Sequence, residues 1–137
     1  MPADAPYSKA HVSQLPTPAG ADPGEAAWRA VRMHFGIGSF GVSAYLAEKA
    51  GEAVVPEHDE IDTRHEELFF VGSGHAVVSV AGGEIDAPAG TLVYVRDPGL
   101  TRTARAIEPG TTVLAVGGEP GKVFEVSSWE RKHIVDG

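Results

Sequence analysis

The chain has 137 residues, the length of one domain, with a formal net charge of −8 and no cysteine. The missing cysteines exclude disulfides, thiolate metal sites and cysteine nucleophiles. The excess of acidic residues and the lack of a basic run argue against a nucleic-acid partner. No apolar stretch approaches the roughly 18 residues that a membrane-spanning helix needs. Met1 to Tyr7 also lack the apolar core of a secretory signal, so we expect a cytoplasmic protein.

Short extended segments separated by turns are predicted along most of the chain. Residues 1–27 hold five of the ten prolines and read as an extended N-terminal arm, with one short strand over 8–14. The remainder divides into a barrel over 28–126 and a C-terminal tail over 127–137. Apolar and polar residues alternate in runs over 28–35, 39–47, 52–57, 67–72, 75–81, 91–95, 101–107, 112–116 and 122–126, followed by one helical turn over 127–133.

The turn signals favour an antiparallel all-β fold. They recur every 8 to 12 residues, and Gly82-Gly83 between two apolar runs is a two-residue hairpin signal. This spacing is typical of a sandwich or a barrel.

Two motifs resemble those of the cupin family, over about residues 37–118. Glu67 stands seven residues before Gly74, and Pro88-Ala-Gly90 opens an apolar strand that runs to Val95. The resemblance implies an all-β fold of the cupin type, a double-stranded β-helix or jelly-roll barrel, here with an N-terminal arm.

The same resemblance implies a reduced metal site. Cupin sites use two histidines two residues apart, then a glutamate, then a later histidine. Here His58 and Glu60 stand at the histidine pair, Glu67 at the glutamate and Thr101 at the last histidine. One imidazole and two carboxylates suit a divalent metal (Fe, Mn, Zn or Ni) with open positions. Two alternatives stay open: that 58–62 is a solvated acidic loop with no cofactor, and that His65 is the cavity imidazole.

Two arginines near the second motif are candidate ligand-binding residues. Arg102 and Arg105 lie on opposite faces of the run over 101–107, so one of them points inward whichever face is buried. An inward arginine would either pair with Glu60 or Glu67 or bind an anionic ligand. Tyr45 is a third candidate ligand-binding residue.

These features predict a protein that binds a small molecule in its cavity. The leading hypothesis is a metal-dependent enzyme of the oxygenase or isomerase kind. The alternatives are a metal-free ligand-binding or sensory protein with an arginine-anchored cavity, and a structural dimer module. We also expect a homodimer, since the arm and an outward apolar face need cover; that face comprises Leu68, Phe70, Leu92 and Tyr94.

Overall fold

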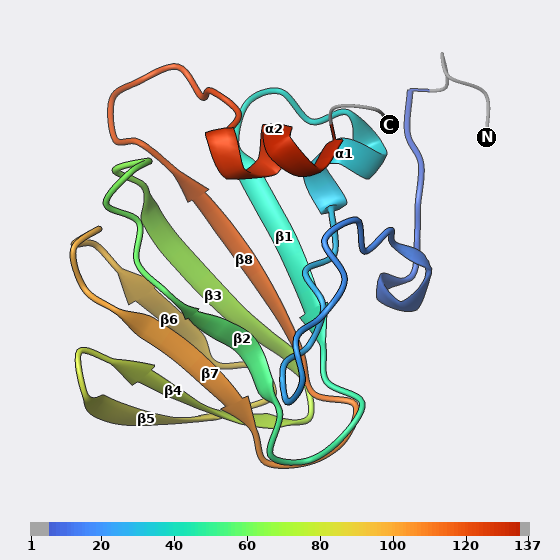
Figure 1. Cartoon of the computed structure of the whole chain (residues 1–137), viewed down its shortest axis with the longest axis vertical. Helices are drawn as coiled ribbons and strands as arrows, with labels where there is room; N and C mark the ends of the chain where they lie inside the picture. The colour runs from blue at the N-terminus through green and yellow to red at the C-terminus, as the bar shows by residue number, and fades with distance from the viewer. Residues whose placement is uncertain (1–5, 135–137) are drawn as a thin grey trace.

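The computed structural model describes residues 6–134, which form two four-stranded antiparallel sheets that face each other (Figure 1). The strand orders are β1-β8-β3-β6 and β2-β7-β4-β5. The parts of the predicted arm before Pro6 and of the predicted tail after Ile134 lie outside these residues. The strands are β1 (Gly41–Leu46), β2 (Ala53–His58), β3 (Glu66–Ser73), β4 (His75–Val80), β5 (Gly83–Pro88), β6 (Leu92–Val95), β7 (Arg102–Ala106) and β8 (Thr112–Gly118). The predicted all-β fold is confirmed.

Alternation along the strands separates an interior from an outer surface. On β3, Glu67, Phe69 and Val71 are buried, while Leu68 and Phe70 between them are exposed. β7 resolves the question that the sequence left open, because its buried residues are Arg102, Ala104 and Ala106, and Arg105 is exposed. The arginine that faces the interior is therefore Arg102.

The interior between the two sheets has two ends that differ in the side chains that fill them. At the apolar end, defined by Ala47, Val71, Ala106 and Val113, every side chain is fully buried. At the acidic end, defined by His58, Glu60 and Glu67, polar groups converge instead. His58 faces Arg102 in the pairing of β2 with β7 at this end.

Gly74 closes the apolar end, at the turn between β3 and β4. Its φ is +74°, in the left-handed region, and a Cβ placed there would lie 2.6 Å from the Cα of Thr111. Only glycine fits both the conformation and the space. The glycine of the first motif therefore has a packing role.

The described helices are short: η1 (Val12–Gln14), α1 (Val31–Phe35) and α2 (Ser128–Ile134). The helical turn predicted over 127–133 is confirmed by α2. None of the helices in residues 6–134 is long and apolar enough to cross a membrane.

Three predicted strands are wrong. Residues 31–35 form α1, which ends at Gly36 in the left-handed conformation with its N–H donated to the carbonyls of Arg32 and Met33. The run over 28–35 has apolar residues on both faces of the predicted strand, so its pattern does not distinguish a strand from a helix. Residues 12–14 form a 3₁₀ turn in place of the strand predicted over 8–14, and 122–126 are irregular.

The N-terminal segment packs on the outer face of β1. Leu15 and Val31 form a buried apolar cluster with Val42 and Ala44. On the same sheet, the outer side chains Leu92 and Tyr94 are 62% and 52% exposed. The homodimer stays a prediction: sedimentation analysis at micromolar concentration would test it, and a 14.3 kDa monomer would contradict it.

Candidate functional site

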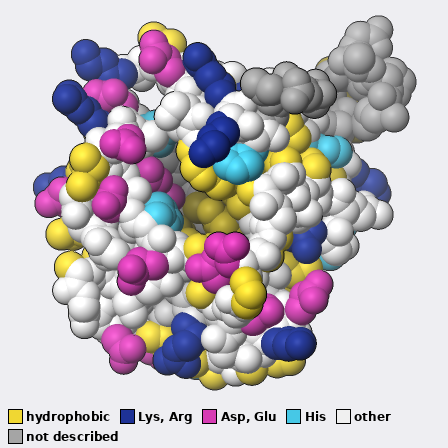
Figure 2. Space-filling model, in the orientation of Figure 1, with side chains coloured by type: hydrophobic (Ala, Val, Ile, Leu, Met, Phe, Trp, Pro, Cys, Tyr) yellow, Lys and Arg dark blue, Asp and Glu magenta, His cyan; other side chains and the backbone are white. Residues whose placement is uncertain are grey.

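A pocket of about 460 Å³ opens at the acidic end. It is lined by residues of β1, β2, β3 and β8, by the loop over 59–65, by Trp28 and by the segment over 124–130. Figure 2 shows a hollow with a hydrophobic floor and with acidic and histidine side chains around its mouth, and a basic side chain at its upper edge. In Figure 1, α2 lies at the upper ends of β1 and β8, where it supplies part of this lining.

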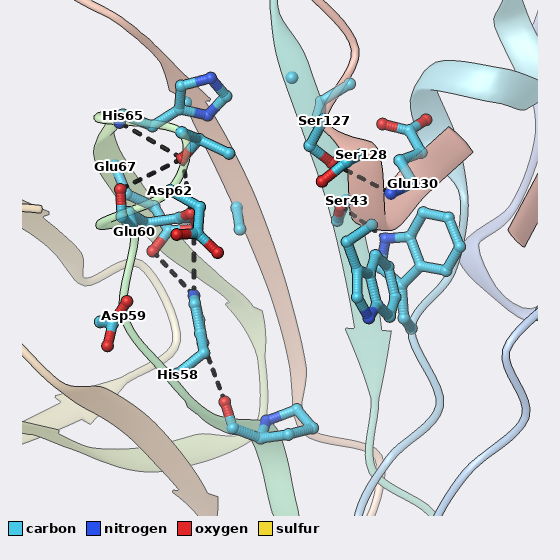
Figure 3. Close-up of a pocket in the computed structure, with 18 of the residues that line it drawn as sticks. Ser43, His58, Asp59, Glu60, Asp62, His65, Glu67, Ser127, Ser128 and Glu130 are labelled. Atoms are coloured by element: carbon cyan, nitrogen blue, oxygen red, sulfur yellow. Dashed lines mark hydrogen bonds and ion pairs between the residues drawn. The ribbon is translucent and has the colours of Figure 1, made fainter. Parts of the chain in front are cut away.

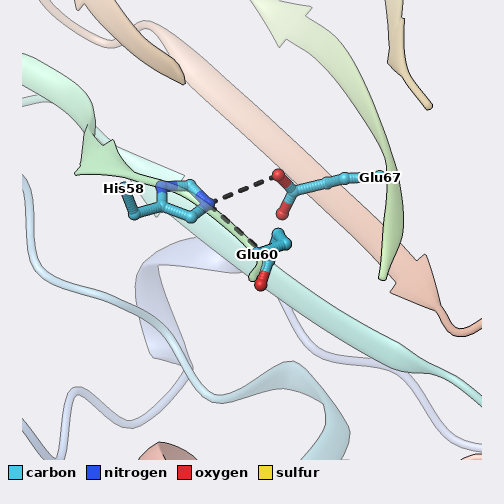
Figure 4. Close-up of side chains that lie close together, drawn as sticks. All are labelled: His58, Glu60 and Glu67. Carbon is cyan, nitrogen blue, oxygen red and sulfur yellow. Dashed lines mark ion pairs between the residues drawn. The ribbon is translucent and has the colours of Figure 1, made fainter. Parts of the chain in front are cut away.

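Three ligand-type side chains meet on one wall of the pocket. The Nε2 atom of His58 lies 3.3 Å from Oε1 of Glu67 and 3.7 Å from Oε1 of Glu60 (Figure 4). One ligand atom from each of the three residues lies within 4.8 Å of the other two. The set is the one predicted as metal ligands, and the structure brings all three together.

Glu67 is held from behind by Arg102. The Arg102 side chain is fully buried, and its Nη1 donates to Oε1 of Glu67 at 2.9 Å. Its other nitrogens donate to backbone carbonyls, Nε to Leu100 at 2.9 Å and Nη2 to Asp97 at 3.0 Å. This guanidinium therefore fixes one carboxylate oxygen and has no part in lining the pocket.

Glu60 reaches the site from a folded loop. β2 ends at His58, so Glu60 lies beyond the strand and does not share its face. The loop bends back because the Glu60 N–H donates to the Pro98 carbonyl at 2.9 Å, and Thr63 Oγ1 donates to Oε2 of Glu60 at 2.9 Å. The neighbouring Asp59 is exposed, as expected of a solvated loop, but Glu60 itself is half-buried.

Hydrogen bonding fixes the orientation of the His58 ring. Nδ1 lies 2.9 Å from the carbonyl oxygen of Pro56, which only accepts, so Nδ1 carries a proton and Nε2 faces the two carboxylates. Burial alone would lower the pKa of His58, but the nearby Glu60 and Glu67 carboxylates and the Pro56 carbonyl together outweigh it and raise that pKa to about 10. Without a metal, Nε2 therefore carries a proton near neutral pH as well, and the imidazolium faces both carboxylates.

The same cluster of charges also shifts the pKa values of Glu60 and Tyr45. Burial would raise the pKa of Glu60, but the nearby His58, Thr63 and His65 side chains together outweigh it, and the pKa falls below its usual value. Burial, together with the charges of Glu67 and Glu60, raises the pKa of Tyr45. Tyr45 lines the pocket, so it presents a phenol that keeps its proton.

The three side chains fit a divalent cation. Ligands at about 2.0–2.2 Å from a metal lie about 2.8–3.6 Å apart when neighbouring bonds make angles of 90–110°. The His58–Glu67 separation of 3.3 Å lies within this range, and the His58–Glu60 separation of 3.7 Å is just above it. Arg102 offsets the charge of Glu67, so the site attracts a cation less strongly than two free carboxylates would.

The two remaining candidate residues, His65 and Arg105, lie outside the ligand cluster. His65 lines the pocket beside Phe124, with ring centroids 5.8 Å apart, but lies outside the ligand cluster. Arg105 is exposed on β7 and is not among the residues that line the pocket.

Sequence reasoning missed an aromatic wall across from the ligand cluster, seen on the opposite side of Figure 3. Both tryptophans of the chain, Trp28 and Trp129, line the pocket with their ring centroids 4.7 Å apart. Trp28 Nε1 donates to Ser43 Oγ at 2.8 Å. Trp129 lies 101 residues after Trp28 in the chain, so no local pattern links the two.

Comparison with known proteins places the fold. No protein-family model and no curated protein matches the sequence. Similar solved structures include a cupin protein from Bacteroides fragilis (TM-score 0.60, 20% identity, covering 97% of this chain and 96% of that one). Another is a conserved double-stranded β-helix protein from Klebsiella pneumoniae (TM-score 0.62, 16% identity, 88% and 99%). A third is a predicted oxalate decarboxylase from Thermotoga maritima (TM-score 0.50, 16% identity, 69% and 78%). The chain has the cupin fold, as the motifs around Glu67 and Gly90 implied.

Proposed function

We propose that the protein binds a divalent metal through His58, Glu60 and Glu67 and acts on a small molecule held in the adjoining pocket. One observation carries the proposal: an imidazole and two carboxylates converge within 4.8 Å on the wall of a cavity of about 460 Å³. A neutral imidazole with carboxylates is a donor set for Fe(II), Mn or Zn.

The chemistry that such a site supports is of the oxygenase or isomerase kind. A metal held by His58, Glu60 and Glu67 would keep open positions for a ligand and would supply Lewis-acid chemistry there. Around it, Tyr45 keeps its phenol proton and can donate a hydrogen bond to a ligand in the pocket. The likeness in fold to a predicted oxalate decarboxylase supports an enzyme that acts on a small molecule.

Metal titration tests the proposal. Purified protein is stripped with chelator, then titrated with Mn(II), Zn(II), Ni(II) and, without oxygen, Fe(II), and bound metal is measured by elemental analysis after gel filtration. We expect one equivalent in the wild type and a loss of at least about tenfold in affinity for His58→Ala, Glu60→Gln and Glu67→Gln. His65→Ala is the matched control and should bind as the wild type does.

Two outcomes would contradict the assignment. If His65→Ala abolished binding while His58→Ala did not, the wrong imidazole has been assigned. If the wild type bound no metal, the metal-dependent enzyme would fail as a whole.

A metal-free binding protein is the second candidate, and the His58 proton favours it. With its pKa raised to about 10, the His58 imidazolium and the Arg102 guanidinium together balance the charges of the two carboxylates, so the wall is stable without a metal. The arginine-anchored form of this hypothesis has less support, because Arg102 is fully buried behind Glu67 and neither Arg102 nor Arg105 lines the pocket.

A further inference from the structure

The charge of the pocket lining is one-sided. Six carboxylates line it, whereas none of the lining residues described within 6–134 is a lysine or arginine. The six are Glu57, Asp59, Glu60, Asp62, Glu67 and Glu130. Two of them are paired with arginines behind the wall, Glu67 with Arg102 and Glu130 with Arg32. An anionic ligand would meet like charges here.

Part of this negative charge remains whether or not a metal is bound. His58 or a cation compensates Glu60, but Glu57, Asp59 and Asp62 form no ion pair among the residues that the structure describes. All three are exposed and lie at the rim of the pocket. The basic residues of α2, Arg131 and Lys132, are exposed and do not line it. The rim therefore attracts cations.

The aromatic residues supply the second feature. The lining holds four aromatic side chains, Trp28, Tyr45, Phe124 and Trp129. The N–H of Trp28 is already donated to Ser43, so this indole offers no free donor to an anion. Trp129 is 48% exposed, which leaves much of its ring open to contact. The faces of such rings carry partial negative charge and attract ammonium groups.

We propose that the pocket binds a small organic ammonium ion, with its cationic nitrogen against the Trp28–Trp129 wall and close to the acidic rim. Carboxylates and indole faces both favour a positive group, and aromatic carbon accepts its hydrocarbon part. An uncharged aromatic ligand would contact the indole rings but would not be attracted by the carboxylates of the rim. This assignment names the ligand class of the proposed pocket, but it uses neither the metal nor its three ligands.

Three probes with one ring and different charges test this inference. Benzylamine, benzyl alcohol and benzoate are titrated by calorimetry at neutral pH, into chelator-treated protein and into protein supplied with Zn(II). We expect benzylamine to bind at least about fivefold tighter than benzyl alcohol, and benzoate to bind weakest. Added NaCl should weaken the binding of benzylamine and leave that of benzyl alcohol unchanged.

Two variants separate the charge from the aromatic wall. Asp62→Asn should weaken benzylamine and leave benzyl alcohol unchanged, whereas Trp129→Leu should weaken both. Tyr94→Leu, on the outer face of β6, is the matched control and should alter neither. The proposal is overturned if benzoate or benzyl alcohol binds as tightly as benzylamine, if no probe binds at millimolar concentration, or if Trp129→Leu has no effect. Metal content is measured separately, so a protein without metal that prefers benzylamine would sink only the metal proposal.

Discussion

The two ends of the barrel interior are filled by different interactions, apolar packing at one end and a buried ion pair at the other. At the apolar end, Ala47, Val71, Ala106 and Val113 are fully buried and leave no polar atom to satisfy. At the acidic end, the equivalent space holds Glu67 and the fully buried Arg102, with a pocket beyond them. A buried ion pair contributes less net stability than close-packed apolar side chains of similar volume. The acidic end therefore gives up packing and gains a charged, accessible wall.

The largest effect should come from breaking the ion pair at the acidic end. Arg102→Met would leave Glu67 buried without its guanidinium, and the carbonyls of Leu100 and Asp97 without their donor. We expect a loss of about 3–5 kcal/mol in the free energy of unfolding, measured by urea denaturation. The double variant Arg102→Met, Glu67→Gln should recover part of that loss, because it removes the unpaired charge. Equal stability of the single and double variants would contradict this account.

At the apolar end, the largest effect should come from backbone geometry. Gly74→Ala would force a Cβ to within 2.6 Å of the Cα of Thr111, at a φ of +74°. We expect a loss of about 2–4 kcal/mol in unfolding free energy, from the clash and the strained φ together. Gly82→Ala is the matched control, since its φ is +85° with nothing within 4 Å of the added atom, and it should cost about 1 kcal/mol. Equal costs would show that the contact with Thr111 relaxes.

The apolar end could be predicted from the sequence, and the acidic end only in part. Gly74 and the alternation on β3 report local constraints, so turn spacing and period-2 patterns locate them. Local patterns failed at 28–35, where apolar residues fall on both faces and Gly36 permits a helical turn. Tertiary packing selects the structure of such a segment.

The pocket shows where sequence reasoning ends. His58 and Glu67 could be identified through motif spacing, although the geometry that brings Glu60 to them is a loop and not a strand face. The sequence left two roles open for an inward-facing arginine, an ion pair with a glutamate or the binding of an anion. Only the structure, in which Arg102 is buried on β7, shows that it pairs with Glu67. The aromatic wall joins Trp28 to Trp129 across nearly the whole chain, so their proximity exists only in the fold.

Titration should distinguish the two ends further, because the shifted imidazole lies at the acidic one. The folded-state pKa of His58 is about 10, above the ordinary 6.5, so its contribution to the metal-free protein is complete below about pH 6.5 and is lost as pH rises through 10. We expect unfolding free energy to fall between pH 7 and 10 by on the order of 1 kcal/mol, since the imidazole is partly hydrated. His58→Gln should lack this component. Metal affinity should rise over the same range, since the metal and the Nε2 proton compete for one site.

The smallest difference should come from one surface ion pair at each end. Arg32 and Glu130 are 2.7 Å apart with side chains only 11% and 12% exposed, and they hold α2 against α1. His75 and Asp86, near the apolar end, are 2.6 Å apart but 34% and 74% exposed. Solvent screens the second pair far more, so Asp86→Asn should change unfolding free energy by less than about 0.5 kcal/mol, and Glu130→Gln should cost about 1 kcal/mol.

Tryptophan emission gives these two variants a second readout. Glu130→Gln should also shift that emission, because Glu130 adjoins Trp129 on α2, whereas Asp86→Asn should not. If both variants lost the same stability and neither altered the emission, the Arg32–Glu130 pair would not hold the aromatic wall in place. The hold on Trp129 would then have to come from its ring contacts with Trp28 and His133, at centroid distances of 4.7 and 4.3 Å.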